Sequence, residues 1–174
     1  DPKGLDVQIY TPAKFHAQYK EKGIPTDFSF ALQPNELTAE DWCLTFGVGI
    51  NEPIGVFIEK IINDLREKKT NGYAIADIIA AIGKETKSDA AVRDAVTNRF
   101  MNCEHWGIFA EKGTPITDLA LPGKVTVFDL SCYATMPNGW NIKCLVVGLI
   151  CQKLFMHRML VRKNEEFAEL HDSM

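Results

Sequence analysis

A short apolar stretch late in the chain, from Val125 to Leu130, follows the Pro122-Gly123 turn. A nearly continuous run of apolar residues of this length is typical of a strand that is covered on both faces, as the strands of parallel sheets are. The stretch therefore predicts a well-buried strand of a parallel sheet and places the chain in the α/β class.

Two further extended segments are predicted near the N-terminus. Val7 and Ile9 alternate with a polar residue, and Thr11-Pro12 is expected to end that strand because proline cannot donate to a sheet. Phe28, Phe30 and Leu32 alternate similarly. We expect the strands at Val7 and Val125 to pair with strands outside this chain. Since unpaired strand edges promote association, the isolated chain is expected to self-associate.

Most of the remaining residues have helical patterns. Thr38 and Asp41 have the spacing of a capping box, which predicts a short helix beginning at Thr38. Apolar residues recur at helical spacing from Pro53 to Leu65, which predicts an amphipathic helix. Further helices are expected over 73–82 and from Ser88 through Phe100.

A long helix is predicted over 141–170. Its first half is apolar on nearly all sides and is expected to be deeply covered. The run from Cys144 to Cys151 is much shorter than the roughly 20 residues that cross a bilayer, and Lys153 follows it, so we interpret it as a buried helix and expect no membrane span. The chain is then a single partial domain, 1–174, with a helical part at roughly 38–106 and a strand-plus-long-helix part at roughly 122–170.

Charge and cysteine usage narrow the class of protein. A formal net charge of −4 argues against a protein whose whole surface binds nucleic acid. The same net charge is compatible with one local basic face that does so. The five cysteines include no CxxC pair, which indicates free, buried thiols and a cytoplasmic location. The chain begins with Asp1-Pro-Lys-Gly4, without an initiator Met or a signal-peptide pattern, and is expected to be a piece of a longer protein.

Asp129, at the end of the apolar strand, is a candidate Walker B carboxylate of the kind that holds Mg²⁺ through water. Leu130 stands where a glutamate normally follows, and an apolar strand that ends in Asp more often caps the next loop, so the structural interpretation is favoured. No Gly-x-x-x-x-Gly-Lys-Ser/Thr sequence occurs, and the chain alone is therefore expected to hold no nucleotide. No metal site is predicted, because the histidines and cysteines lack metal-ligand spacing.

Basic residues provide two further candidates. The last helix carries a cluster that could face phosphates, but Glu165 and Glu166 follow it and favour a solvated, salt-bridged face; the cluster comprises Lys153, His157, Arg158, Arg162 and Lys163. Arg99 lies between apolar neighbours and needs a buried acid, a backbone partner or an interface. An arginine so placed in a ring ATPase can reach a neighbour's γ-phosphate, while an ordinary salt bridge is the more common use.

Several motifs together resemble HerA/FtsK-like P-loop ATPases. The run Pro122-Gly-Lys-Val-Thr-Val-Phe-Asp-Leu-Ser131 is the most specific and is similar to the segment before Walker B in that family. The other similar stretches, in chain order, are Asp1-Pro-Lys-Gly4, Val7-Gln-Ile-Tyr-Thr-Pro12, Pro34-Asn-Glu-Leu37 before Asp41, Asn98-Arg-Phe100, Gly107-Ile-Phe109, Asp118-Leu119, Leu154-Phe155 and Arg158.

The resemblance implies a helix-rich fragment of a RecA/FtsK-like ATPase core, located between the phosphate loop and Walker B. It implies a hexameric motor that moves along double-stranded DNA, with ATP and Mg²⁺ at subunit interfaces and, in archaea, a role in processing DNA ends with a nuclease partner. Arg99 and Arg158 are then candidate interface arginines, Asp1 and Asp129 candidate nucleotide-binding residues, and Lys153, Arg162 and Lys163 candidate nucleic-acid contacts. Both nucleotide motifs are missing, and loop 132–139 does not match the family.

Two alternatives remain open. A stand-alone helical interaction module without enzymatic activity would recruit a partner through the groove between its amphipathic helices. A phosphate loop encoded upstream would favour the motor instead. A DNA-binding domain that uses the last helix would bind in a strongly salt-dependent way, and charge reversal at Arg158 and Arg162 tests it.

Overall fold

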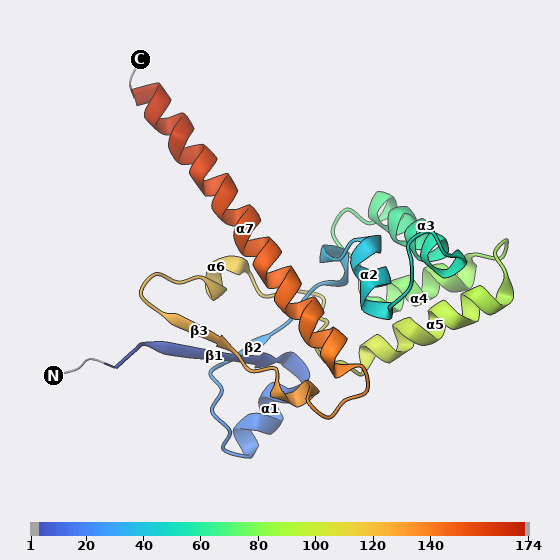
Figure 1. Ribbon diagram of the computed structural model, residues 1–174, viewed down its shortest axis with the longest axis horizontal. Coiled ribbons are helices and arrows are strands. Elements are labelled where there is room, and N and C mark those ends of the chain that lie inside the picture. Colours follow the sequence, from blue (N-terminus) through green and yellow to red (C-terminus); the bar gives the residue numbers. More distant parts are fainter. Residues whose placement is uncertain (1–3, 173–174) are drawn as a thin grey trace.

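The computed structural model describes residues 4–172, which form a small parallel sheet beside a cluster of helices (Figure 1). The elements follow the order β1 (Val7–Pro12), α1 (Ala13–Glu21), β2 (Phe28–Phe30), η1 (Pro34–Glu36), α2 (Ala39–Phe46), α3 (Pro53–Lys68), α4 (Ile75–Lys84), α5 (Ala90–Glu104), α6 (Ile116–Leu119), β3 (Val125–Phe128), η2 (Ser131–Tyr133) and α7 (Gly139–Asp172). The α/β class is confirmed, with helix predominating. Helix α1 was not predicted from the sequence, because Pro12 before it provides no side-chain cap.

The sheet has the strand order β2-β1-β3, and all of its pairs are parallel. Val7 lies opposite Val125 and Tyr10 lies opposite Phe128, so the first and last predicted strands are neighbours. The expectation that both would find their partners only outside this chain was therefore wrong. Sequence patterns mark strands but do not specify which strand a given strand will pair with.

One face of the sheet is covered by α6. Gln8 is buried, and its Nε2 donates to Thr126 Oγ1 at 2.8 Å and to the carbonyl oxygen of Asp118 at 3.2 Å. Thr126 Oγ1 in turn donates to the carbonyl oxygen of Leu119 at 2.8 Å. These bonds satisfy a buried amide and join β1, β3 and α6.

The opposite face is open at β1 and β3. Val7, Val125 and Val127 share this face by strand alternation, and their exposed fractions are 43%, 40% and 40%. We call these three residues the valine face. The prediction that β3 is well buried was therefore wrong for this side of the strand, because no helix within residues 4–172 covers it.

The helices α2 to α5 begin and end largely where the sequence predicted. At the start of α2 the Thr38 hydroxyl accepts from the Asp41 N–H at 3.2 Å, and the Asp41 carboxylate accepts from the Thr38 N–H at 2.8 Å. The predicted capping box is confirmed. Helix α5 begins at Ala90, two residues after the predicted start at Ser88, because the carboxylate of Asp89 caps it and accepts from the Ala91 N–H at 2.7 Å.

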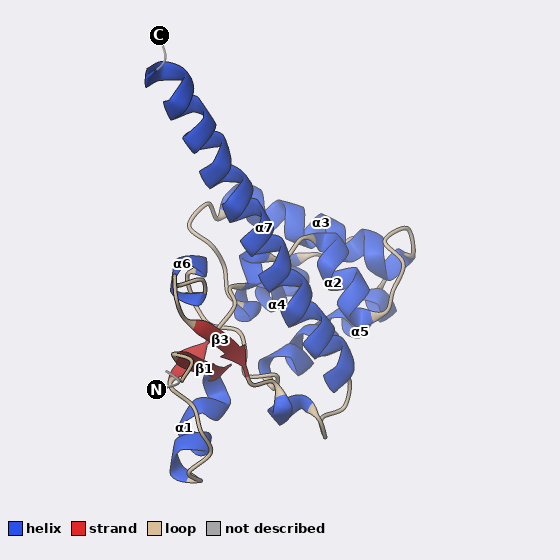
Figure 2. Ribbon diagram, turned by 60° about the vertical axis from the view of Figure 1, so that its left-hand side comes forward, coloured by secondary structure: helices blue, strands red, loops and turns tan. Residues whose placement is uncertain are grey.

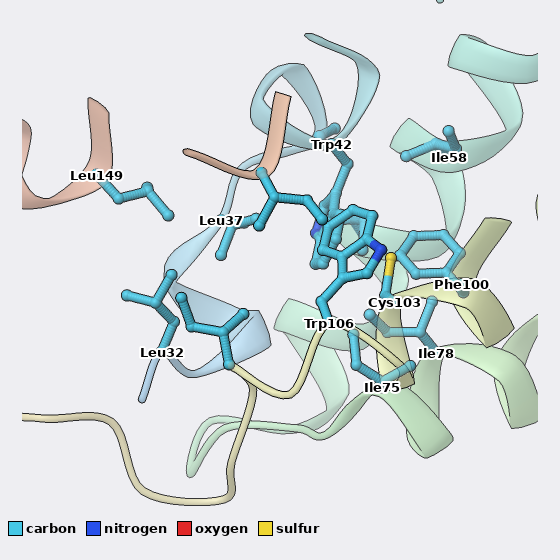
Figure 3. Close-up of a cluster of buried hydrophobic side chains, with 14 of the residues drawn as sticks. Leu32, Leu37, Trp42, Ile58, Ile75, Ile78, Phe100, Cys103, Trp106 and Leu149 are labelled. Atoms are coloured by element: carbon cyan, nitrogen blue, oxygen red, sulfur yellow. The ribbon is translucent and has the colours of Figure 1, made fainter. Parts of the chain in front are cut away.

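An aromatic cluster holds these helices together (Figure 3). Trp42 and Phe100 are fully buried, with ring centroids 4.9 Å apart, and Phe46 packs edge-on against Phe100 at 5.2 Å. Trp106, which follows α5, also contacts Phe46. Aliphatic side chains from α3 and α4 complete the core, among them Ile58, Ile61, Ile62, Ile75, Ile78 and Ile82.

Helix α7 leaves the body of the molecule. A single stripe, which we call the buried stripe, packs inward and consists of Ile142, Val146, Leu149 and Ile150. The C-terminal half extends beyond every other element (Figures 1 and 2). Only 17% of its most apolar 18-residue window is buried, so the expectation of a deeply covered first half was wrong. By length and composition alone α7 could cross a membrane, but one such helix is weak evidence.

The aromatic cluster leads to a stability prediction. Phe100→Ala is expected to lower the free energy of unfolding by about 3–5 kcal/mol, because it leaves a cavity beside Trp42 and Phe46. Met101→Ala on the same helix is the control, since Met101 is half exposed, and should cost less than about 1 kcal/mol. Urea unfolding followed by circular dichroism measures both. Equal losses would contradict the assignment of the core.

Candidate functional site

Asp129 lies directly after β3, at the carboxyl end of the sheet. One oxygen of its carboxylate accepts from the Ser131 N–H at 2.9 Å, and η2 begins at that serine. This is the loop-capping arrangement that the sequence favoured over a magnesium ligand. The second predicted nucleotide residue, Asp1, lies outside the described residues. Within the described part of the chain, no three His, Cys, Asp or Glu side chains gather as metal ligands would.

Arg99 lies on α5, where its guanidinium donates to the carbonyl oxygen of Ala95 at 3.0 Å. The expected salt bridge is replaced by this backbone bond, since no acid lies within ion-pair distance of Arg99 among the described residues. Arg99 also lines a cleft of 450 Å³, together with Phe46, Asn102, His105, Trp106, Met136, Pro137 and Asn138. A cationic group beside an open cleft is suited to contact an anionic ligand or a neighbouring chain.

Two arginines of α7 are paired with acids of the same helix. Arg158 lies 3.7 Å from Glu165 and Arg162 lies 3.2 Å from Glu166, and all four side chains are mostly exposed. Exposed pairs of this kind contribute about 0–1 kcal/mol, so either arginine can exchange its carboxylate for a phosphate at little cost. The salt-bridged interpretation of this face therefore fits the structure for these two arginines.

Lys153 has a different role. Its ammonium lies 2.5 Å from the Glu36 carboxylate, and both side chains are three-quarters or more buried. This ion pair ties α7 to η1, and Lys153 is thus engaged within the fold. Lys163, the remaining nucleic-acid candidate, is exposed on the projecting part of the helix.

The two candidate interface arginines are not brought together. Arg99 lines its cleft beside Asn138, immediately before α7 begins, whereas Arg158 lies well along that helix. At about 1.5 Å per residue, the stretch from Asn138 to Arg158 rises about 30 Å. In one copy of the chain the two arginines therefore cannot contact the same phosphate.

The cysteines fall into two environments. Cys43 and Cys103 are buried, and burial raises the pKa of both thiols. Burial, followed by the nearby Asp129 carboxylate, raises the pKa of the Cys132 thiol to about 11. Cys144 and Cys151 are exposed on α7. The expectation of buried thiols was wrong for these two, because only one side of α7 is covered.

Comparison with protein-family models, with curated proteins and with solved structures found no match to this chain. The candidate site therefore depends on the geometry alone.

Two features were missed in the sequence, the valine face and the buried amide of Gln8. Both depend on which side of a strand is covered, and the short strands here carried no signal for that.

The cysteine environments predict a reactivity pattern. At pH 8 and high dilution, iodoacetamide should label Cys144 and Cys151 readily but leave Cys132 almost untouched. A pKa of about 11 leaves Cys132 in the unreactive thiol form, with about one thiolate per thousand molecules at pH 8. That fraction rises about a hundredfold by pH 10.

Peptide mapping by mass spectrometry measures the labelling of each site. Unfolding in urea is the control, because it should make all five cysteines react alike. Labelling of Cys132 at pH 8 as fast as that of Cys144 would contradict the assigned environment.

Proposed function

We propose that this chain is part of the core of a HerA-like, ATP-driven DNA translocase, from the region between its phosphate loop and its Walker B strand. The observation that carries the proposal is the incomplete parallel sheet. Parallel sheets are covered on both faces in nearly all proteins, whereas the valine face here lies open. Such a sheet is expected to continue into further strands and helices of a larger domain.

The outer edge of β3 supports the same proposal. Among the described residues β3 pairs with β1 alone, so the N–H and C=O groups along its other side have no sheet partner. An apolar strand with a bare edge is a ready template for another strand. In the proposed parent, the strand that follows α7 would lie in this sheet and supply the missing contacts.

The proposed parent binds ATP and Mg²⁺ at subunit interfaces of a cytoplasmic hexamer and moves along double-stranded DNA, with a nuclease as partner. This chain contributes no phosphate loop, so alone it would be inactive. Arg158 is the better interface candidate, because it is exposed and only loosely paired with Glu165 at 3.7 Å. Arg99 is the second candidate, since it lines an open cleft.

A stand-alone interaction module is the alternative, and one observation favours it. One continuous core joins helices α2 to α5 to the sheet and to α7, and Trp42, Ile58 and Ile78 are fully buried in it. A unit with such a core needs no parent domain in order to fold. The following experiment separates the two proposals.

Val127→Lys tests whether the valine face is covered in the natural protein. In the isolated chain this substitution should change the free energy of unfolding by less than about 1 kcal/mol, because Val127 is partly exposed there. In the longer protein encoded by the same reading frame, it should cost more than about 2 kcal/mol, because a charge would be buried.

Val56→Lys on α3 is the control, since Val56 is half exposed on a helix far from the sheet. It should cost little in both proteins. A similarly small effect of Val127→Lys in both would contradict a larger ATPase core and favour the stand-alone module.

The interface arginines give a kinetic prediction. The isolated chain should bind no ATP in a calorimetric titration, whereas the longer protein should hydrolyse ATP in the presence of duplex DNA. Arg158→Ala or Arg99→Ala should lower kcat by about 1000-fold, with ATP binding retained, because a trans arginine stabilises the transition state more than the bound nucleotide.

Arg93→Ala is the control on α5, since this guanidinium donates to the carbonyl oxygen of Ser88 within its own segment. Its kcat should be unchanged. Full activity of both test variants would refute the arginine assignment, and an absence of ATPase activity in the longer protein would refute the proposed function.

A further inference from the structure

The outward side of α7 presents a regular, uncovered row of residues. They recur every three or four positions on the side opposite to the buried stripe, and we call them the outer seam: Trp140, Cys144, Gly148, Cys151, Phe155, Arg158 and Arg162. Trp140 is 73% exposed and Phe155 is 65% exposed. A spacing of three or four residues is the pattern by which one helix packs along another.

The surface around the outer seam is also apolar. Val147 and Leu44 lie exposed beside it, and a groove of 300 Å³ runs between α2 and α7. Cys144 and Gly148 line that groove. From Trp140 to Arg162 the row extends about 33 Å, at about 1.5 Å per residue. A continuous exposed row of this length is typical of an interaction surface.

The outer seam of one copy is complementary in shape to the outer seam of a second copy that runs in the opposite direction. Its first half has small residues at Cys144, Gly148 and Cys151, and its second half begins with the large side chain of Phe155. A Cβ placed on Gly148 would meet no atom within 4 Å, so the space above this glycine is open. Gly148 and Phe155 are equally distant from the midpoint between Cys151 and Gln152. An antiparallel pair centred there sets each Phe155 over the Gly148 of the other copy.

Charge supports the same register. In an antiparallel pair, Arg158 of one copy falls opposite Leu145 of the other, beside the groove that Asp41 lines from α2. Arg162 and Lys163 fall near the exposed indole of Trp140, over which Lys143 of the same helix already lies at 5.5 Å from the ring centroid, so this pair of ends adds no charge attraction. The groove beside the first half of the seam therefore carries the carboxylate of Asp41, and the second half of the seam is basic. A symmetric contact of this kind satisfies both ends at once.

We propose that α7 pairs antiparallel with α7 of a second copy of this chain. Phe155 of each copy fills the space over Gly148 of the other, and the two Cys151 side chains face each other near the two-fold axis. This contact uses the outer side of α7 and none of the residues of the valine face, so it does not rest on the open sheet that carries the proposed function. Arg158 is the one residue that both proposals place at an interface.

A lipid bilayer is the less suitable occupant. Lys143 and Lys153 both lie in the apolar stretch of α7, and Lys153 is paired with Glu36. The buried stripe is docked on the rest of the fold as well. Insertion into a membrane would break these contacts and place two lysines in hydrocarbon.

Mild oxidation tests the proposal directly. Diamide takes two protons and two electrons from a pair of thiols, which become a disulfide while diamide is reduced to its hydrazine. Because two Cα atoms must lie within about 7 Å to form this bond, the proposed register allows it only between the two Cys151 residues. The full chain should give a disulfide-linked dimer on a non-reducing gel.

Cys151→Ser should abolish the linked dimer, and Cys144→Ser is the matched control that should retain it. Both cysteines are exposed on the same helix. If the disulfide formed by random collision of two molecules, the two variants would therefore lose the linked dimer to the same extent. A linked dimer that survives Cys151→Ser would refute the register.

Sedimentation equilibrium tests the pairing without oxidation. Gly148→Glu should weaken dimerisation by at least about tenfold, because it fills the space for Phe155 and adds a charge. Met156→Glu is the control, since Met156 is exposed on α7 but lies off the outer seam. A monomer at every concentration, or a dimer insensitive to Gly148→Glu, would overturn the proposal. Co-sedimentation with phosphatidylcholine vesicles at the expense of the dimer would overturn it in favour of a membrane.

Discussion

The pairing of β1 with β3 is the interaction on which the rest of this structure depends. It joins residues that are more than a hundred positions apart, and Gln8 bonds to Thr126 across a separation of 118 residues. Bringing such distant segments together costs conformational entropy, although that cost grows only slowly with loop length. Two features offset this cost in entropy. One is the set of hydrogen bonds that the buried Gln8 amide makes with β3 and α6, and the other is the burial of the helices that lie between the two strands in the sequence. Without this pairing, β3 and α7 would have no fixed relation to the helices.

The same pairing creates the incomplete surface of the molecule. Because side chains alternate along a strand, placing Gln8 and Thr126 against α6 directs the valine face away from it. The core of the helical cluster is covered on all sides, because its aromatic and aliphatic side chains pack against one another. The chain thus combines a well-covered helical core with a sheet that is open at the valine face and along the outer edge of β3. That contrast supports a region of a larger α/β domain.

Helix α7 carries the second open surface. Its buried stripe and the Lys153–Glu36 ion pair attach the first part of the helix to the fold. Beyond that attachment, Arg158 and Arg162 pair with glutamates of their own helix, so the projecting part contacts little else. The outward side is left free for a long contact with another helix. Because the outer seam matches an antiparallel copy of itself, a second copy of this chain is the partner that fits it best.

The sequence by itself determined the local features of this protein. The capping box of Thr38 and Asp41, the amphipathic pattern of α3 and the loop-capping use of Asp129 follow from neighbouring residues, whose interactions are short in range. Only the tertiary structure decided that β1 and β3 are neighbours, that Val125 and Val127 are exposed, and that Cys144 and Cys151 face outward. Hydrophobic patterns report which residues prefer burial, but burial itself requires a covering element. That element is set by contacts between distant parts of the chain, or by another polypeptide.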